Sequence, residues 1–283
     1  MITAAFEYYR PASLDEALRL LGGRDDAKIL AGGHSLIPMM KLRLAEPAAL
    51  IDIAAIPDLG RIDFDGKRFR IGALVTHATL AANRDLEKNA PALWDAANHI
   101  GDPQVRNRGT IGGSASHGDP SADYPSVLLA LGATLSLAGK SGSRDVGADA
   151  FFRGMFDTAL APGEILTTVS FDAAPASAYA KYQHPASGYA MVGVAANLRL
   201  NGGTVGEARI AVTGVGDSAF RAGNVEKALA GARAGDADAI KKACSNAASG
   251  VDARADSQAS GTYRAAMADV YAARAVSAAA ARG

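Results

Sequence analysis

Two glycine pairs are the residues of this chain whose type and spacing best suit the binding of a ligand. The first, Gly32-Gly33, precedes His34 and Ser35, and the second, Gly112-Gly113, follows 80 positions later. A backbone without Cβ atoms can turn sharply, and the consecutive N–H groups of such a turn form a concave site for an anion. We therefore expect the two turns to hold one long anionic ligand between them.

The surroundings of both pairs favour this interpretation over an ordinary tight turn, which explains most Gly-Gly-polar triplets in a chain with 31 glycines. Each pair is expected at the end of a strand, and the first of these strands spans residues 28–31. A helix can begin in residues 36–42, which would put the first turn at its positive end. The second pair lies in the polar stretch 104–123, and a long polar loop inside a compact domain is usually functional.

The chain resembles the flavoprotein (medium) subunits of molybdenum hydroxylases, the family of aerobic carbon monoxide dehydrogenase and xanthine dehydrogenase. The resemblance rests on two FAD-binding signatures, AGGHSLIPMMKLRL at residues 31–44 and QVRNRGTIGGSASHGDPSADYPSVLLALGA at residues 104–133. It extends over nearly the whole chain, through residues 181–182 and 260–264. The two motifs are specific when they occur together at this spacing.

This resemblance implies an α+β fold with two domains. The first is a two-lobed FAD-binding domain of the vanillyl-alcohol-oxidase/PCMH type over residues 1–175, with lobes at about 1–55 and 56–175. The second is a smaller α+β domain of the carbon monoxide dehydrogenase flavoprotein type over residues 178–283, an antiparallel sheet with helices. The linker between them, residues 172–177, is composed of small residues and proline after its leading aspartate.

The resemblance also implies which residues hold FAD. Two groups surround the pyrophosphate: Ile29, Leu30, Ala31, Gly32, Gly33, His34, Ser35, Leu36 and Ile37 in the first signature, and Thr110, Ile111, Gly112, Gly113 and Ser114 in the second. Gly109 and His117 of the second signature are also expected to bind the cofactor. Asp123 accepts from the ribose or ribityl region, and Leu160 packs near the adenine. Lys181 lies beside the flavin, whose ring system is flanked by Ile100 and Tyr189. No residue is expected to act as a catalytic acid, base or nucleophile, or as a metal ligand.

Several of these residues have a second interpretation on chemical grounds. Asp123 is equally suited to cap a helix over residues 124–131. Lys181 is either a solvated strand residue or a flavin neighbour, and Tyr189 is either a core residue or a wall of the ring site. Arg106 and Arg108 either order their own segment or meet an acidic surface of a partner.

Composition limits the classes of partner and location. With 29 basic and 29 acidic residues and no basic stripe, a nucleic acid partner is not expected. No apolar stretch reaches the ~18 residues of a membrane span, and the N-terminus does not read as a secretory leader. The expected location is cytoplasmic, with at most a peripheral position at the inner face of the membrane through partners. The lone Cys244 cannot hold an iron–sulfur cluster, which needs about four thiolates.

The function implied by the resemblance is electron transfer. FAD on this chain would take electrons from two-iron iron–sulfur clusters on a small subunit, while the substrate is oxidised on a large subunit that holds the molybdenum cofactor. The acceptor would be a quinone, NAD, oxygen or a carrier protein, and the assembly a dimer of heterotrimers. Two alternatives stay open: a stand-alone flavin oxidase or reductase of the same fold, and a binding module that has lost its flavin.

The elements that position these residues follow from local patterns. In the first lobe we predict strands at residues 6–9, 28–31 and 50–53, with the first two strands parallel. A helix that begins after Ser13 is predicted at residues 14–21. In the second lobe we predict strands at 69–72, 134–137 and 165–171 and helices after Thr76 and at 91–100. A hairpin at 189–213 turns at Asn201-Gly202-Gly203, and helices follow at 225–230, 237–248 and 262–281.

One further motif is not expected to bind a ligand. Residues 214–219 match the G-x-G-x-x-A form of the dinucleotide fingerprint. The strand before it is the second arm of the predicted hairpin, and residues 220–224 interrupt any immediate helix. A nicotinamide site there is therefore disfavoured.

Overall fold

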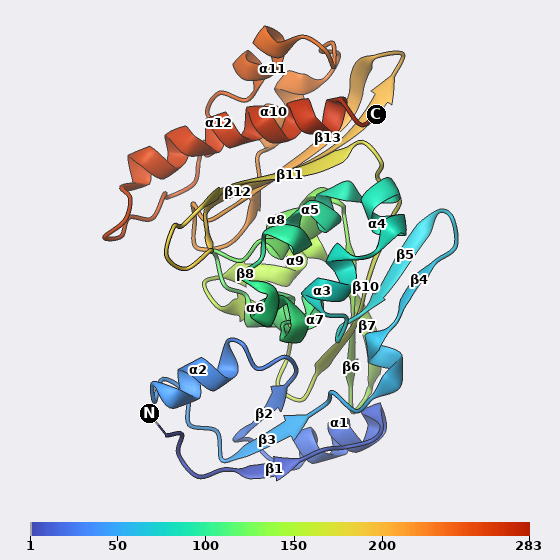
Figure 1. Ribbon diagram of the computed structural model, residues 1–283, viewed down its shortest axis with the longest axis vertical. Helices are drawn as coiled ribbons and strands as arrows, with labels where there is room; N and C mark the ends of the chain where they lie inside the picture. The colour runs from blue at the N-terminus through green and yellow to red at the C-terminus, as the bar shows by residue number, and fades with distance from the viewer. Residues whose placement is uncertain (1) are drawn as a thin grey trace.

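The structure, a computed structural model, describes residues 2–283 and divides into three parts along its long axis (Figure 1). A small α/β lobe at the N-terminus is followed by a middle lobe, in which helices pack on a five-stranded sheet, and then by a four-stranded sheet covered by the C-terminal helices. Each part contributes most of one cluster of buried apolar side chains, and the middle cluster also includes Tyr179, Ala195 and Ala211 of the C-terminal sheet. The expected α+β fold is confirmed.

The N-terminal lobe is a parallel sheet in the order β1 (Glu7–Tyr9), β3 (Ala49–Asp52), β2 (Ala27–Leu30). Helix α1 (Leu14–Gly22) begins after Ser13, whose hydroxyl accepts the N–H of Glu16 at 3.2 Å. The predicted parallel direction of β1 and β2 is confirmed, but β3 lies between them, and its residues are the most buried of the three strands. Helix α2 (Leu36–Lys41) follows the first glycine pair.

The middle lobe has an antiparallel sheet in the order β4 (Ile62–Phe64), β5 (Arg68–Gly72), β10 (Ile165–Asp172), β6 (Thr134–Gly139), β7 (Gly142–Gly147). The helices of this lobe are η1 (Pro57–Gly60), α3 (His77–Ala81), α4 (Arg84–Asn89), α5 (Pro91–His99), α6 (Pro103–Arg108), α7 (Ile111–His117), α8 (Tyr124–Ala130) and α9 (Ala148–Phe151). A short hairpin, β8 (Phe152–Gly154) and β9 (Asp157–Thr158), completes it. The predicted strands and the helix starts at Thr76 and Pro91 are confirmed.

The stretch 104–123 is largely helical, so its prediction as one long loop is wrong. Helix α6 begins after Asp102, whose carboxylate accepts the N–H of Val105 at 2.8 Å. Helix α7 begins after Thr110, whose hydroxyl accepts the N–H of Gly113 at 3.0 Å. Side-chain caps and packing against neighbours stabilise these short helices although their residues are polar or small. The second glycine pair thus lies in the first turn of a helix and follows a helix, where a strand was predicted.

The C-terminal sheet has the order β11 (Ser177–Gln183), β12 (Ala190–Asn201), β13 (Thr204–Thr213), β14 (Phe220–Arg221), and all its pairs are antiparallel. Helix α12 (Gly261–Ala280) packs across β11 and β12, with α11 (Ala237–Ala243) beside it (Figure 1). Helix α10 (Gly223–Leu229) packs on β13 and against α11. The predicted hairpin is confirmed, whereas α11 ends at Ala243 and not at Ala248. Residues 214–219 lead into β14 rather than into a helix.

The division into folding domains at residues 175–178 stays a prediction. Residues 176–178 already belong to the C-terminal sheet or its core, and Ser177 begins β11. None of the helices within residues 2–283 has both the length and the apolar character of a membrane-spanning segment.

Candidate cofactor site

The first glycine turn presents a row of unpaired backbone donors. Gly33 has a φ of 76°, in the left-handed region that favours glycine. Within residues 2–283, no acceptor receives the five consecutive N–H groups from Gly32 to Leu36. The ring Nδ1 of His34 lies 3.1 Å from the carbonyl oxygen of Gly32, which folds this side chain back over the turn. Consecutive unpaired N–H groups on a partly exposed turn can receive an anion.

The second glycine turn has its donors occupied. The N–H groups of Ile111, Gly112 and Gly113 donate to the carbonyls of Val75 and Ala73 and to the hydroxyl of Thr110, at 3.0, 2.9 and 3.0 Å. The expectation that both turns present free amides is therefore wrong for the second turn. Its glycines serve packing instead, since a Cβ on Gly112 would stand 2.6 Å from the carbonyl oxygen of Ala73.

The two glycine turns nevertheless lie against each other, as the sequence predicts. A Cβ built on Gly32 would overlap the carbonyl oxygen of Arg108 and stand 2.8 Å from the Cα of Gly109. A Cβ on Gly113 would lie 3.7 Å from that of Ala31. The contact joins the N-terminal lobe to the start of α7, and it places the unpaired amides of the first turn beside residues 108–113.

A buried histidine, His77, supports this junction. It is not among the site residues predicted from the sequence. The N–H of His77 donates to the carbonyl of Gly109 at 3.0 Å, and its ring Nδ1 lies 2.9 Å from the hydroxyl of Tyr124. Burial, together with the nearby basic groups of His34 and Arg106, lowers the pKa of His77 to about 4. A single histidine after a capping threonine carries no sequence signal for a ligand-binding role.

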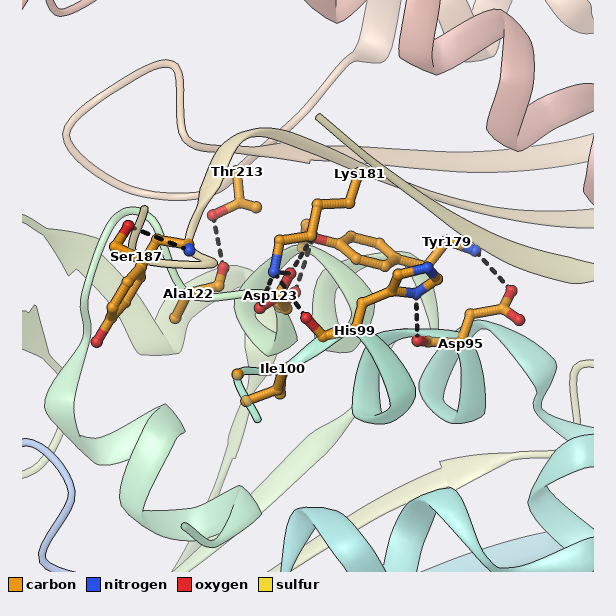
Figure 2. Close-up of polar contacts among 12 residues, drawn as sticks. Asp95, His99, Ile100, Ala122, Asp123, Tyr179, Lys181, Ser187 and Thr213 are labelled. Carbon is orange, nitrogen blue, oxygen red and sulfur yellow. Dashed lines mark hydrogen bonds and ion pairs between the residues drawn. The ribbon is translucent and has the colours of Figure 1, made fainter. Parts of the chain in front are cut away.

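A buried ion pair joins the middle lobe to the C-terminal sheet (Figure 2). The ammonium of Lys181 on β11 lies 2.9 Å from Oδ1 and 3.0 Å from Oδ2 of Asp123, and it donates to the carbonyl of His99 at 3.1 Å. The side chains of Lys181 and Asp123 are 1% and 6% exposed. The hydroxyl of Tyr179 donates to Oδ1 of Asp123 at 2.6 Å. Burial raises the pKa of Asp123, and the neighbouring ammonium opposes this effect.

This geometry decides three of the open interpretations. The carboxylate of Asp123 makes no capping bond to α8, so the capping interpretation is wrong. Lys181 is not solvated, because its side chain is buried against Asp123. Tyr189 is not a core residue, since it is 44% exposed at the start of β12. Ile100 lies at the end of α5, next to the carbonyl of His99 that Lys181 contacts (Figure 2).

The remaining predicted residues have different surroundings. Arg106 donates to the carbonyls of Ile100 and Gly101 at 3.0 and 2.8 Å, which confirms that it orders its own segment. His117 ends α7 at the opposite end from the glycine pair, and its ring centroid lies 5.0 Å from that of Phe156. Leu160 is half-buried against the core of the middle lobe. The structure thus brings the two signatures together at one centre, and Asp123 and Lys181 together at another.

The C-terminal sheet holds the segment that connects the two centres, residues 118–123. The hydroxyl of Thr213 lies 2.9 Å from the carbonyl oxygen of Pro120. It also lies 2.8 Å from the carbonyl oxygen of Ala122, a contact drawn in Figure 2. The N–H of Gly214 also donates to Pro120, and that of Ala190 donates to the carbonyl of Ser121. The segment from the second glycine turn through α7 to Asp123 is therefore held at its start by Ala73 and Val75 and near its end by the C-terminal sheet.

Comparison with known proteins gives consistent similarities. The family model described as the FAD binding domain in molybdopterin dehydrogenase matches residues 4–172, and that of the CO dehydrogenase flavoprotein C-terminal domain matches residues 177–279. The carbon monoxide dehydrogenase medium chain of Hydrogenophaga pseudoflava is 40% identical, with 100% of this chain and 99% of the relative covered. The xanthine dehydrogenase FAD-binding subunit of Escherichia coli O157:H7 is 33% identical over 72% of each chain. The solved structure of a cyanide-inactivated Cu,Mo-CO dehydrogenase matches with a TM-score of 0.95 at 38% identity over 100% of both chains.

Proposed function

Because this chain belongs to the family of FAD-binding medium subunits of molybdenum hydroxylases, we propose that it carries electrons from an iron–sulfur partner to an external acceptor through FAD bound beside its first glycine turn. The family consists of oxidoreductase subunits that work in multi-subunit complexes. When bound, FAD supplies a carrier that accepts electrons singly and holds two of them.

The observation that carries the placement of FAD is the row of five unpaired amides from Gly32 to Leu36. A diphosphate needs several donors, and each charge-assisted hydrogen bond contributes roughly 1.5–3 kcal/mol. Main-chain donors of this kind hold a diphosphate without a basic cluster, which fits a chain of zero formal net charge. Gly33 has a left-handed φ, so a side chain at this position of the turn would be strained.

The other predicted residues have separate tasks in this proposal. Residues 29–37 supply the donors, and Gly109, Thr110, Ile111, Gly112, Gly113 and Ser114 supply the surface that closes the diphosphate site from the side of α7. His117 and Leu160 line the adenosine end. Lys181 sets the charge near the ring system, with Asp123 as its counter-ion, and Ile100 and Tyr189 face the rings.

We infer that its partners are a small subunit with two-iron iron–sulfur clusters and a large subunit with the molybdenum cofactor, in a cytoplasmic dimer of heterotrimers. Because this chain has a single thiol and an iron–sulfur cluster needs about four thiolates, the iron–sulfur electron donor belongs to another chain in this proposal. Cys244 is buried among apolar residues, and burial raises its pKa to about 12, so that it stays protonated and does not act as a thiolate ligand.

Purification of the tagged chain from its native source tests this function. We expect one FAD per chain, with flavin bands near ~370 and ~450 nm, and two co-purifying polypeptides that account for the iron and molybdenum. A chain that purifies alone and oxidises a substrate by itself would contradict the subunit role and support a stand-alone flavin enzyme. A chain that takes up no FAD, alone or with its partners, would show a binding module without flavin.

A further inference from the structure

His77 occupies the junction of the two glycine turns although neither signature contains it. It is the first residue of α3, which packs on α6. A Cβ on Gly109 would overlap Nε2 of His77 and stand 2.7 Å from its Cδ2, so this edge of the imidazole lies directly on the glycine. Gly109 in turn lies against Gly32, the first residue of the row of unpaired amides. The imidazole is therefore one residue removed from the candidate diphosphate site.

The contact with Tyr124 decides which ring nitrogen of His77 carries the proton. Tyr124 is fully buried, and within residues 2–283 Nδ1 of His77 is the one partner of its hydroxyl, at 2.9 Å. If Nδ1 were protonated, the buried hydroxyl hydrogen of Tyr124 would have no acceptor, which costs about 1–3 kcal/mol. Tyr124 therefore donates to Nδ1, and the neutral ring carries its hydrogen on Nε2.

The Nε2–H group is available to a ligand. No residue in the described chain accepts a hydrogen bond from it. Among residues 2–283, the side-chain nitrogen that is both fully buried and without a partner is Nε of Arg264, so Nε2 of His77 retains some contact with solvent. His77 as a whole is 5% exposed. The nearby groups that help to lower its pKa, His34 and Arg106, are both basic. A neutral N–H donor in basic surroundings suits an anionic oxygen.

We propose that His77 is a further ligand-contacting residue of the FAD site, and that its Nε2–H donates a hydrogen bond to a phosphate oxygen of the cofactor. Tyr124 acts as the positioning residue that fixes the tautomer. This inference rests on the proposed function, because it takes the diphosphate beside Gly32 as its acceptor. It adds a side-chain donor on the face of α3 to a site that otherwise consists of main-chain amides.

Two substitutions of His77 separate ligand contact from structural support. In His77→Gln the side-chain amide reaches the position of Nε2, whereas in His77→Asn it reaches that of Nδ1 and leaves Nε2 without a replacement. We expect His77→Asn to weaken FAD binding by about 10- to 100-fold, the loss typical of one hydrogen bond to a charged group. His77→Gln should stay within a few-fold of the wild type. FAD affinity is measured by titrating the full-length apoprotein, and thermal unfolding of each apoprotein reports structural support.

The outcomes distinguish this inference from the proposed function. If the wild type binds FAD and both variants bind it equally well, or both lose affinity only in proportion to their loss of apoprotein stability, His77 is a structural residue and the inference is wrong. If the wild-type chain itself binds no FAD, the proposed function fails as well. Nitrogen NMR of the histidine rings gives an independent readout: Nε2 of His77 should carry the proton in the apoprotein and shift when FAD binds.

Discussion

Gly32 lies against the backbone carbonyl of Arg108 so closely that a Cβ at this position would overlap the oxygen and stand 2.7 Å from the carbonyl carbon. The two residues belong to different lobes and are brought together by the first glycine turn and the end of α6. Neither neighbouring group is a flexible side chain, so the contact cannot be relieved by a rotamer change.

The change Gly32→Ala should therefore separate the two turns and reduce FAD binding severely. Backbone atoms would have to move, which typically costs 1–3 kcal/mol in a well-packed contact. FAD content after purification and the midpoint of urea unfolding measure the effect. Gly22→Ala in α1 is the control, because a Cβ there meets nothing within 4 Å and should leave FAD content unchanged. Equal FAD content in both variants would contradict the placement of the site.

Gly33→Val tests the unpaired amides themselves. A β-branched residue at a φ of 76° is strained by about 1–3 kcal/mol, and relief of this strain would turn the amides away from one another. We expect loss of FAD. Gly66→Val is a matched control: Gly66 has a φ of 90° and open space at its Cβ, so it carries similar strain in the β4–β5 turn. Retention of FAD in Gly33→Val and its loss in Gly66→Val would overturn the assignment.

Lys181 and Asp123 should show a large coupling energy. Removal of one member of a buried ion pair leaves an uncompensated charge and typically costs 3–5 kcal/mol, whereas replacement of both by apolar residues costs less than the sum. We expect this pattern for Lys181→Met, Asp123→Leu and the double variant in urea unfolding at pH 7. The exposed pair Arg84–Glu87 is the comparison, with an expected coupling below about 1 kcal/mol. Additive effects at Lys181 and Asp123 would mean that the pair is not formed.

The hydroxyl of Thr213 should matter for FAD binding although it lies on the C-terminal sheet. Thr213→Val leaves the carbonyls of Pro120 and Ala122 without this donor and releases the segment that leads to Asp123. We expect weaker FAD binding and a loss of about 1–3 kcal/mol in stability. Thr167→Val removes a similar bond, from the Thr167 hydroxyl to the carbonyl of Ser136 at 3.0 Å, and should lower stability without weakening FAD binding. Equal FAD affinities in the two variants would exclude the link.

His77 should make folding stability depend on pH below about 6.5. Its pKa is about 4 in the folded chain and 6.5 in the unfolded chain. Between these values the unfolded state binds a proton that the folded state does not, so the free energy of unfolding decreases as the pH falls. One pKa unit corresponds to about 1.4 kcal/mol, which gives a loss of about 3 kcal/mol from pH 6.5 to pH 4. The difference between the wild type and His77→Gln in urea titrations should have this slope, and parallel curves would contradict the burial of a neutral ring.

Local sequence signals predicted most of the secondary structure. Ser13, Thr76 and Ser260 each precede a helix, and in the structure each hydroxyl accepts an N–H three residues later. The hairpin at Asn201-Gly202-Gly203 was predictable because Gly202 and Gly203 both adopt positive φ, which glycine does without strain. Such signals depend on bonds within a few residues, and they do not require knowledge of the rest of the fold.

Signals failed where a distant contact decides the outcome. Helix α7, in the stretch predicted as a loop, is held by Ala73 and Val75, more than 30 residues away, which accept its first two N–H groups. Asp123 had a suitable position to cap α8, but Tyr179 and Lys181 on β11 attract its carboxylate. His77 went unnoticed as a site residue because its partners, Gly109 and Tyr124, have no fixed spacing from it in the chain.

The sequence by itself determined the family, the cofactor and the pairing of the two glycine turns. These follow from two glycine-pair motifs at a fixed spacing, a combination that few folds need. Only the tertiary structure decided how the work is divided between the turns. The N–H groups of Gly32 to Leu36 stay unpaired, whereas those of Ile111 and Gly112 donate to carbonyls of the loop after β5 and that of Gly113 donates to the hydroxyl of Thr110. A hydrogen-bond donor is available to a ligand only if no other part of the chain supplies an acceptor, and this depends on residues that the fold, not the local sequence, brings near.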